Sequence, residues 1–435
     1  MARTARPPRL MSLVLTIGLL AAACAPQAPA GSGGGAAQKP AELKVAMVDF
    51  QSGGAAKFGA TALNAGKLTF DQINAAGGIG GVKVNYQMVD EAGTVDQVVT
   101  NYRRLVLDEK VDVVMGYTSS ANCLAVGPVA EELKKLTLIH ICGTYRLFEE
   151  NNFKYVIRTA AHGVTDSVGA ALYAIQAKPD LKTVAAINDD YAWGRDSWEL
   201  FRTALLKLKP DVQVKEELWP KAFVGEYSAE LSKLQAAKAD IIHTSLWGGH
   251  MDSFIKQAQA RNLFTETLVV MTTGETGLLT LGKDVPPGIA MSGRGQYMYI
   301  PDPEQNALNK KFIADYSAAH NEIPVYPAYR MVQAITGLKA GYEKAMKANG
   351  DRWPSQEQVS EAFTDLTYET PTGTISTKAN HDTHQQSVYG ITGGRPDPRF
   401  GFPLLERVAV FPADQVNPPP GTKTLDWINS SFGKR

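Results

Sequence analysis

The chain has 435 residues, 44% of them apolar and 20% charged, and its 44 basic side chains are balanced by 44 acidic ones. This length is enough for two or three domains, each with its own core. A formal net charge of zero leaves no basic excess for nucleic acid and no acidic tail, so we expect no nucleic-acid partner.

The first 24 residues have the three-part composition of a secretory signal peptide. Several arginines form a basic start, residues 10–20 are an apolar run too short for a permanent membrane span, and small residues precede Cys24. A cysteine in this position resembles the lipidation site of bacterial lipoproteins, although Ala21 stands where that pattern favours leucine. We therefore expect export and a lipid anchor on Cys24. Ordinary secretion with an incidental cysteine is the alternative.

Residues 25–40 are rich in Ala, Gly, Pro, Ser and Gln and contain almost no large apolar side chain. This composition predicts a flexible linker. Behind an acylated cysteine, such a linker would hold a globular body away from the membrane. We expect localisation at the periplasmic or outer face of the cell envelope.

Strands and helices alternate through the next part of the chain. The expected elements follow in order: strand 43–50, helix 60–73, strand 82–89, helix 95–108, strand 111–115, helix 125–135 and strand 136–141. The glycines at 77 and 78 end the first helix because glycine accepts left-handed backbone angles. This rhythm predicts a parallel sheet with right-handed crossovers.

The same alternation starts again at residue 183. The second series is strand 183–187, helix 198–208, strand 212–218, helix 227–237, strand 241–245, helix 251–261 and strand 268–271. Helices at 304–319 and 329–348 follow, and from about residue 367 the Pro- and Gly-rich end reads as irregular. The fold class is therefore α/β, with two doubly wound parallel-sheet lobes. Ligands of such sheets lie beyond the carboxyl ends of the strands, which predicts a site in a cleft between the lobes.

Several short motifs resemble one known family. They are FDQINAAGGIGG at 70–81, VDEAG at 89–93, RRLV at 103–106 with VDVVMG at 111–116, the serines at 119–120, and NDDYAWGR at 188–195. In this order and spacing they are similar to the branched-chain amino-acid type (type I) of periplasmic solute-binding protein. The likeness covers about residues 43–370.

The resemblance implies a Venus-flytrap fold of two lobes joined by three crossover segments, near residues 158–163, 286–296 and 365–375. Lobe 1 would comprise 41–160 and 294–366. Lobe 2 would comprise 161–293 and 367–435, including a C-terminal tail. Family members bind leucine-like amino acids, amides, urea or small aromatic acids and deliver them to ABC transporter permease subunits.

A carboxylate ligand needs hydroxyls and free backbone N–H groups at a helix start. Ser119 and Ser120 follow a strand and precede a helix, and they match the serines that hold the carboxylate in the family. Gly143 and Thr144, after the fourth strand, match its second pair. Helix capping is the structural alternative for the serines, and it is compatible with ligand binding.

The remaining site residues are expected from the second lobe and from aromatic positions. Glu275 follows a strand where the family carries an acid that meets the ligand amine, and a solvated loop acid is the alternative. Phe58, Trp193 and Trp247 stand where relatives often have tyrosine, so the predicted wall is larger and lacks phenolic hydroxyls. This departure leaves room for a more planar ligand. Tyr326 and Tyr329 open a helix and are further candidates for the cleft wall, beyond the eight residues expected to bind the ligand.

Two cysteines remain in the mature body, Cys123 and Cys142. Both fall near the ends of predicted strands, so an exported protein can join them. Two separate buried thiols are the alternative, because a free cysteine behaves as a small hydrophobe.

We expect no metal, no cofactor and no catalysis. His381 and His384 are three residues apart, but their neighbours predict a loop and no third ligand is evident. The favoured interpretation is a solute-binding protein for an amino acid or amide. A sensor subunit with the same fold, a binder of a small aromatic acid, and an enzyme on a two-lobed scaffold are the alternatives.

Overall fold

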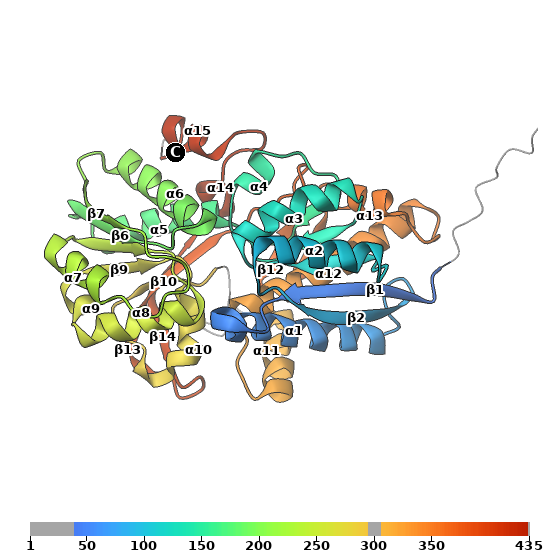
Figure 1. Cartoon of the computed structure of the whole chain (residues 1–435), viewed down its shortest axis with the longest axis horizontal. Helices are drawn as coiled ribbons and strands as arrows, with labels where there is room; N and C mark the ends of the chain where they lie inside the picture. Colours follow the sequence, from blue (N-terminus) through green and yellow to red (C-terminus); the bar gives the residue numbers. More distant parts are fainter. Residues whose placement is uncertain (1–38, 295–305, 434–435) are drawn as a thin grey trace, which may run out of the picture. The chain divides into compact units, whose positions relative to one another are not determined.

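The computed structural model describes residues 39–294 and 306–433. The predicted signal peptide, Cys24 and nearly all of the predicted linker lie outside the described residues. Everything described belongs to one structural unit, Gln38–Arg435. It contains two large sheets and a two-stranded hairpin (Figure 1).

The first sheet has five parallel strands in the order β2-β1-β3-β4-β5. Its strands are β1 (Glu42–Asp49), β2 (Lys83–Asp90), β3 (Val113–Gly116), β4 (Thr137–Ile139) and β5 (Val156–Arg158). Alternate side chains of β1 enter two different cores: Val45 and Met47 pack on one face, and Ala46 and Val48 on the other. Both faces are therefore buried, which explains the continuous apolar runs of the sequence.

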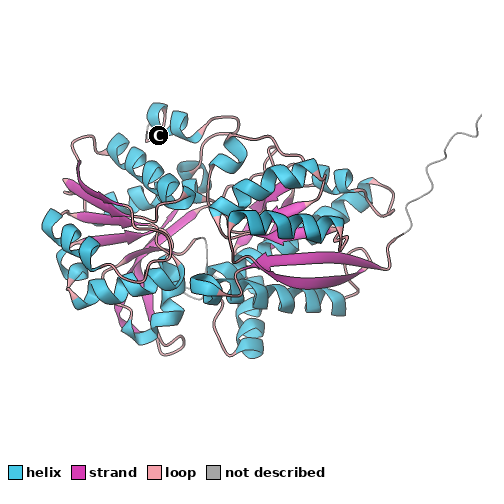
Figure 2. Ribbon diagram, in the orientation of Figure 1, coloured by secondary structure: helices cyan, strands magenta, loops and turns pink. Residues whose placement is uncertain are grey.

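Helices cover both faces of this sheet (Figure 2). They are α1 (Ala56–Ala75), α2 (Val95–Leu107), α3 (Ser120–Glu132), α4 (Arg146–Glu149), α11 (Ala307–His320), α12 (Tyr326–Ala348) and α13 (Gln356–Ala362), with a short turn η1 (Gly53–Ala55) before α1. Helices α2 and α3 contribute side chains to one core, and α1, α12 and α13 to the other. The core that contains α1 is thus completed by α12 and α13, which lie more than 140 residues beyond the last strand of this sheet.

The second sheet has seven strands in the order β14-β13-β10-β9-β8-β6-β7. Its strands are β6 (Thr183–Ile187), β7 (Gln213–Leu218), β8 (Ile241–Thr244), β9 (Leu268–Met271), β10 (Ala290–Ser292), β13 (Ser387–Pro396) and β14 (Pro403–Phe411). Five strands are parallel, but β13 pairs antiparallel with β10 and with β14. The sheet is therefore mixed, and the C-terminal region expected to be irregular supplies its two longest strands.

Helices also flank the second sheet. They are α5 (Gly163–Ala177), α6 (Ala192–Leu208), α7 (Ser228–Ala237), α8 (Gly248–Ala260), α9 (Leu263–Glu266), α10 (Gly277–Leu281), α14 (Ala413–Val416) and α15 (Thr424–Ser430), with the short turns η2 (Gly274–Thr276) and η3 (Gly282–Asp284). No helix in the described ranges is long and apolar enough to cross a membrane.

The hairpin of β11 (Thr367–Thr370) and β12 (Gly373–Ser376) departs from the expected lobe boundary. A boundary at residue 366 assigns it to the second lobe. Its apolar side chains Tyr368 and Ile375 instead pack in a core of the first sheet. The segment that passes from this hairpin to β13 is residues 377–386, later than the expected crossing at 365–375.

One apolar cluster joins helices that cover the first sheet to the second sheet and its helices. Ala65 of α1 and Tyr329 of α12 belong to the same cluster as Met251 of α8 and Leu278 of α10. The helices that cover the first sheet therefore pack directly on helices of the second. We refer to this packing of the two lobes as the closed arrangement.

Candidate functional site

A cavity lies where loops from both sheets meet. Its lining residues are Phe58, Thr118, Ser120, Ile141, Gly143, Tyr191, Trp193, Trp247, Thr273, Arg294 and Tyr326. Most of them follow the carboxyl ends of β3, β4, β6, β8, β9 and β10, which is where open parallel sheets bind ligands. The cavity volume is about 20 Å³, because aromatic side chains fill most of the space between the loops.

Five of the eight residues expected to bind ligand line this cavity: Phe58, Ser120, Gly143, Trp193 and Trp247. The other three, Ser119, Thr144 and Glu275, are not among its lining residues. Their ligand roles, like those of the first five, stay predictions.

The start of α3 explains the position of Ser119. Its backbone N–H donates to Glu91 Oε1 at 2.9 Å, and the backbone N–H of Thr118 donates to Glu91 Oε2 at 2.7 Å. Asn122 Nδ2 donates to the same carboxyl at 2.9 Å. A carboxyl group of the protein itself thus occupies the anion position at this helix start. Burial, with a contribution from the nearby Asp49, raises the pKa of Glu91 to about 8.

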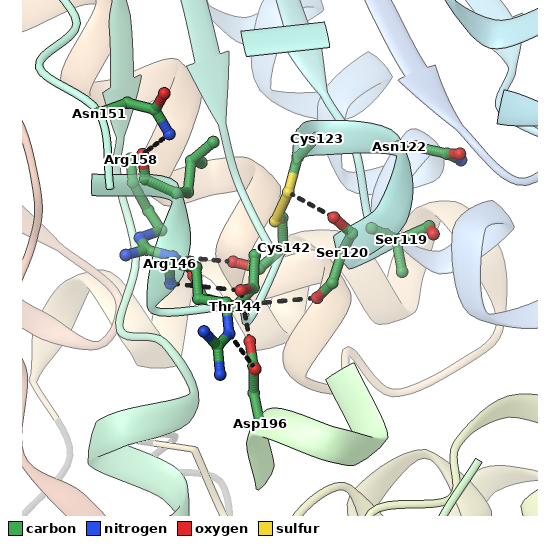
Figure 3. The surroundings of a disulfide bond; sticks show 12 residues. Ser119, Ser120, Asn122, Cys123, Cys142, Thr144, Arg146, Asn151, Arg158 and Asp196 are labelled. Atoms are coloured by element: carbon green, nitrogen blue, oxygen red, sulfur yellow. Dashed lines mark hydrogen bonds and ion pairs between the residues drawn. A yellow bond between two sulfur atoms is a disulfide. The ribbon is translucent and has the colours of Figure 1, made fainter. Parts of the chain in front are cut away.

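Ser120 and Gly143 are brought together by local contacts. The backbone N–H of Thr144 donates to Ser120 Oγ at 3.2 Å, and the Thr144 hydroxyl donates to Asp196 Oδ2 at 2.5 Å (Figure 3). Gly143 permits a close approach by Trp193, because a Cβ atom at position 143 would lie 2.3 Å from a ring carbon of that tryptophan. Thr144 therefore anchors the loop while Gly143 faces the cavity.

A disulfide joins the two segments that carry these residues. Cys123, one turn after Ser120 in α3, is bonded to Cys142, directly before Gly143, with the Cα atoms 6.4 Å apart (Figure 3). Of the two alternatives drawn from the sequence, the structure contains the bridge. It fixes the first turn of α3 against the loop after β4 on the first-lobe side of the cavity.

Aromatic rings form the walls, and hydrogen bonds hold the two indoles in place. Trp193 Nε1 donates to the carbonyl of Ser245 at 2.9 Å, and Trp247 Nε1 donates to Tyr191 Oη at 2.8 Å. Phe58 makes edge contacts with Trp247 and with Tyr326, with ring centres 5.2 and 5.3 Å apart. Both indole donors are satisfied by protein groups, so these walls offer ring faces and edges.

Arg294 is the lining residue of greatest chemical consequence that the sequence analysis missed. It follows β10 and is buried, and Nη2 lies 2.9 Å from Asp166 Oδ2. Its φ of 45° places it in the left-handed region, which is uncommon for a side chain of this size. Its position in an expected crossover segment was the available signal, but its buried partner lies 128 positions earlier in the chain.

Glu275 is buried close to this arginine without lining the cavity. It lies in η2, and 1% of its surface is exposed. Burial opposes the charged form of Arg294, but Asp166 and, to a smaller extent, Glu275 raise the pKa of this arginine above its usual value. Tyr329 is also buried, and its hydroxyl donates to Asn309 Oδ1 at 2.8 Å. No acidic side chain is among the cavity-lining residues within the described ranges. The cavity therefore presents one cation, hydroxyls and aromatic faces.

The described part of the chain contains no group of three or more His, Cys, Asp or Glu side chains arranged to hold a metal ion. His381 and Asp382 lie in the segment that leads to β13, where Asp382 pairs with Arg158.

Solute-binding proteins are among the proteins to which this chain is similar in sequence or fold. A leucine-, isoleucine-, valine-, threonine- and alanine-binding protein of Pseudomonas aeruginosa is 24% identical over 338 residues, which cover 77% of this chain and 85% of that protein. A solute-binding protein of an ABC transporter from Rhodopseudomonas palustris, solved with 3,4-dihydroxybenzoic acid, superposes with a TM-score of 0.74 at 23% identity and covers 88% of this chain and all of its own.

A branched-chain amino acid transporter substrate-binding protein from Streptococcus pneumoniae, solved with isoleucine, superposes with a TM-score of 0.70 at 18% identity, covering 85% of this chain and 99% of its own. The sequence profile described as periplasmic binding protein matches residues 42–392. Because this match covers most of the chain, including every residue that lines the cavity, this chain belongs to the periplasmic binding protein family.

Proposed function

We propose that this protein is an exported receptor that closes on a small organic acid and delivers it to an ABC transporter, without converting it chemically. The observation that carries the proposal is the composition of the cavity. Its lining joins Ser120 and Gly143 of one lobe to Arg294 of the other, between walls of aromatic rings. A carboxylate buried there gains a guanidinium partner that offsets the cost of its desolvation.

The first candidate ligand is an α-amino acid or its amide. The Pseudomonas relative is named for leucine, isoleucine, valine, threonine and alanine, and the Streptococcus protein was solved with isoleucine. An amine needs an acid, and Glu275 is the predicted partner. Replacing Glu275 with Gln should weaken an amine ligand by about 3 kcal/mol, the cost of leaving a buried charge unpaired.

The second candidate is a small aromatic acid, and the cavity favours it. Trp193, Trp247 and Phe58 present ring surfaces, and Arg294 is the charged side chain of the lining. An aromatic acid needs one cation and flat apolar walls and has no amine to neutralise. The Rhodopseudomonas protein was solved with such an acid.

Closure supplies the mechanism for either ligand. Ser120 and Gly143 would hold the carboxylate side of the ligand from the first lobe, and Trp193, Trp247 and Arg294 would complete its surroundings from the second. A ligand that contacts both lobes only when they are closed shifts the balance toward the closed form by its difference in affinity. The proposal includes two lobes joined by three crossover segments, with the β11–β12 hairpin in the first lobe and the last crossing at residues 377–386.

A calorimetric titration of the mature protein separates the candidates. Leucine, isoleucine, benzoate and 3,4-dihydroxybenzoate would be compared with benzamide, which keeps the ring of benzoate and lacks its charge. If benzoate binds tightly and benzamide does not, the aromatic acid is supported. If leucine binds the wild type and not the Glu275→Gln variant, the amino acid is supported. If none of these compounds binds ligand-free protein, the small-acid receptor is contradicted.

The proposal extends to the envelope. Export through the N-terminal signal and acylation of Cys24 would hold the receptor beside its permease subunits. One acyl chain binds membranes only marginally, so a lipoprotein anchor requires more than one. Labelling of cells with a radioactive fatty acid should mark the wild-type protein and not the Cys24→Ser variant. Equal labelling of both would contradict the anchor.

A further inference from the structure

A second cavity, larger than the first, lies against the segments that connect the lobes. Its volume is about 390 Å³, compared with about 20 Å³ for the cavity between the sheets. We call it the hinge cavity and define it by Phe148, His162, Lys378, Asp382, His384 and Pro418–Pro420, which are among its lining residues. A space of this size accommodates a small organic molecule.

The hinge cavity is built on two connecting segments that lie side by side. The backbone N–H of Arg158 donates to the carbonyl of His381 at 2.9 Å, and the Thr383 hydroxyl donates to the carbonyl of Arg158 at 2.8 Å. The backbone N–H of Ala161 donates to Gln385 Oε1 at 2.9 Å. These bonds hold the strand-to-helix passage after β5 against the passage before β13.

The remaining walls come from the two lobes. Phe148 belongs to a core of the first sheet, whereas Val416 and Trp427, on either side of the proline run, belong to a core of the second. Any rotation of one lobe about the connecting segments therefore changes the distance between these walls. A molecule that fits the cavity in the closed arrangement would bind other arrangements less well.

The polar groups of the cavity favour an anion. The two acids are already engaged: Asp382 accepts two hydrogen bonds of 2.7 Å from Arg158, and Glu149 accepts one of 2.9 Å from the backbone N–H of Thr424 and another from its hydroxyl. His162 Nε2 is buried and forms no hydrogen bond within the described residues, although Asp382 Oδ2 is 3.4 Å away.

The rest of the lining offers a cation and flat apolar surface. Lys378 and His384 supply further donors beside His162, whereas Pro418–Pro420 contribute rings and carbonyls but no backbone N–H. Phe148 adds an aromatic ring. We propose that the hinge cavity is a second ligand site, which binds a small ring-containing carboxylate and thereby stabilises the closed arrangement of the lobes.

A chain of contacts connects this site to the first cavity. The Arg158 guanidinium that holds Asp382 also donates through Nη1 to the carbonyls of Cys142, at 3.2 Å, and Thr144, at 2.6 Å (Figure 3). These two carbonyls flank Gly143. The hinge site is therefore coupled to the position of the loop that lines the first cavity. Because coupling is reciprocal, a ligand in either site should raise the affinity of the other.

The experiment uses the mature protein and sodium 4-bromobenzoate as the probe. Crystals are soaked with the probe and the bromine is located by its anomalous scattering, while calorimetry measures affinity in solution. Lys378→Met with His384→Leu removes two donors of the hinge cavity. Gly143→Val blocks the first cavity, since a side chain there meets the ring of Trp193. Ala379→Trp, at an exposed position of the hinge-cavity wall, fills the second cavity without disturbing a core.

We expect bromine in the hinge cavity of the wild type and of Gly143→Val, and at least a tenfold weaker affinity at that site in the donor-removing and cavity-filling variants. Bromine only in the first cavity, or an affinity unchanged by both hinge variants, would overturn the hinge site. The hinge site does not rest on the proposed function: bromine confined to the hinge cavity would support it while counting against an aromatic acid as the ligand of the first cavity.

Discussion

The guanidinium carbon of Arg294 lies 4.1 Å from the centre of the Tyr326 ring. Arg294 follows β10 of the second sheet, and Tyr326 begins α12, which packs on the first sheet. A cation from one lobe is therefore in contact with an aromatic ring attached to the other. Arg294 also pairs with the buried Asp166, so the same side chain takes part in an ion pair, a cation–π contact and the cavity wall.

Replacing Arg294 with Met should lower the free energy of unfolding by about 3 kcal/mol, because Asp166 would stay buried without its cation. The double variant with Asp166→Asn should recover part of this loss, and urea unfolding measures both. Arg103→Met is the matched control, since the Arg103–Glu132 pair is exposed and its removal should cost less than about 1 kcal/mol. A double variant no more stable than Arg294→Met would show that the ion pair does not govern stability here.

Gly143→Ala should weaken binding of the first-cavity ligand at least tenfold, because the added methyl group meets the Trp193 ring in the closed arrangement. Gly225→Ala serves as the control, since a Cβ atom at that position meets nothing within 4 Å. Calorimetry with the identified ligand makes the comparison. Equal affinities in the two variants would mean that Trp193 does not approach position 143 when ligand is bound.

Loss of the Cys123–Cys142 disulfide should reduce the free energy of unfolding by about 3 kcal/mol, as loop closure over 19 residues predicts. Chemical denaturation of the double serine variant, and of the wild type with and without a reducing agent, measures this loss. The reducing agent should leave the stability of the serine variant unchanged. A wild type equally stable in both conditions would contradict a stabilising bridge.

His243 predicts a specific loss of stability in acid. It lies on β8 with no exposed surface, 4.3 Å from the Phe201 ring, and burial lowers its pKa to about 3. In the unfolded state the His243 imidazole therefore binds a proton as the pH falls through about 6.5, whereas in the folded state it stays neutral until about pH 3. The contribution of neutral His243 to the free energy of unfolding is fully present above pH 6.5 and is lost as the pH falls toward 3.

His243→Phe should remove this contribution while keeping an aromatic ring in the cluster. Between pH 7.5 and pH 4.5 the variant should lose about 3 kcal/mol less stability than the wild type. Each protein is its own reference, so any packing change at pH 7.5 cancels in the comparison. Identical losses in both proteins would exclude His243 as a source of acid sensitivity.

The sequence predicted the fold class well because the strands are buried on both faces. Continuous apolar runs marked the strands, and the expected ranges 183–187 and 268–271 coincide with β6 and β9. The prediction of an irregular C-terminal region was wrong after residue 387, for a physical reason. Strand β13 contains three glycines and a proline, and β14, the edge strand, is interrupted by Glu406 and Arg407, so neither gives the continuous apolar run of a buried strand.

The cavity was harder to predict than the sheets. Helix α3 was expected at 125–135 and begins at Ser120, and α6 was expected at 198–208 and begins at Ala192. Their first turns carry small, polar or aromatic residues, so apolar periodicity does not detect them. Arg294 and Tyr326 are 32 positions apart and meet only when the two lobes pack together.

The core of the first sheet also limits the order in which this protein folds. Residues of β1 and β3 pack against Met331 of α12, Phe363 beyond α13 and Ile375 of the hairpin. A chain emerging from its N-terminus therefore carries an uncovered apolar sheet face until nearly all of its length is available. Cleavage anywhere in the second lobe would separate the two halves of that core. Passage through an export channel is compatible with this arrangement, since the native state is out of reach until translocation is almost complete.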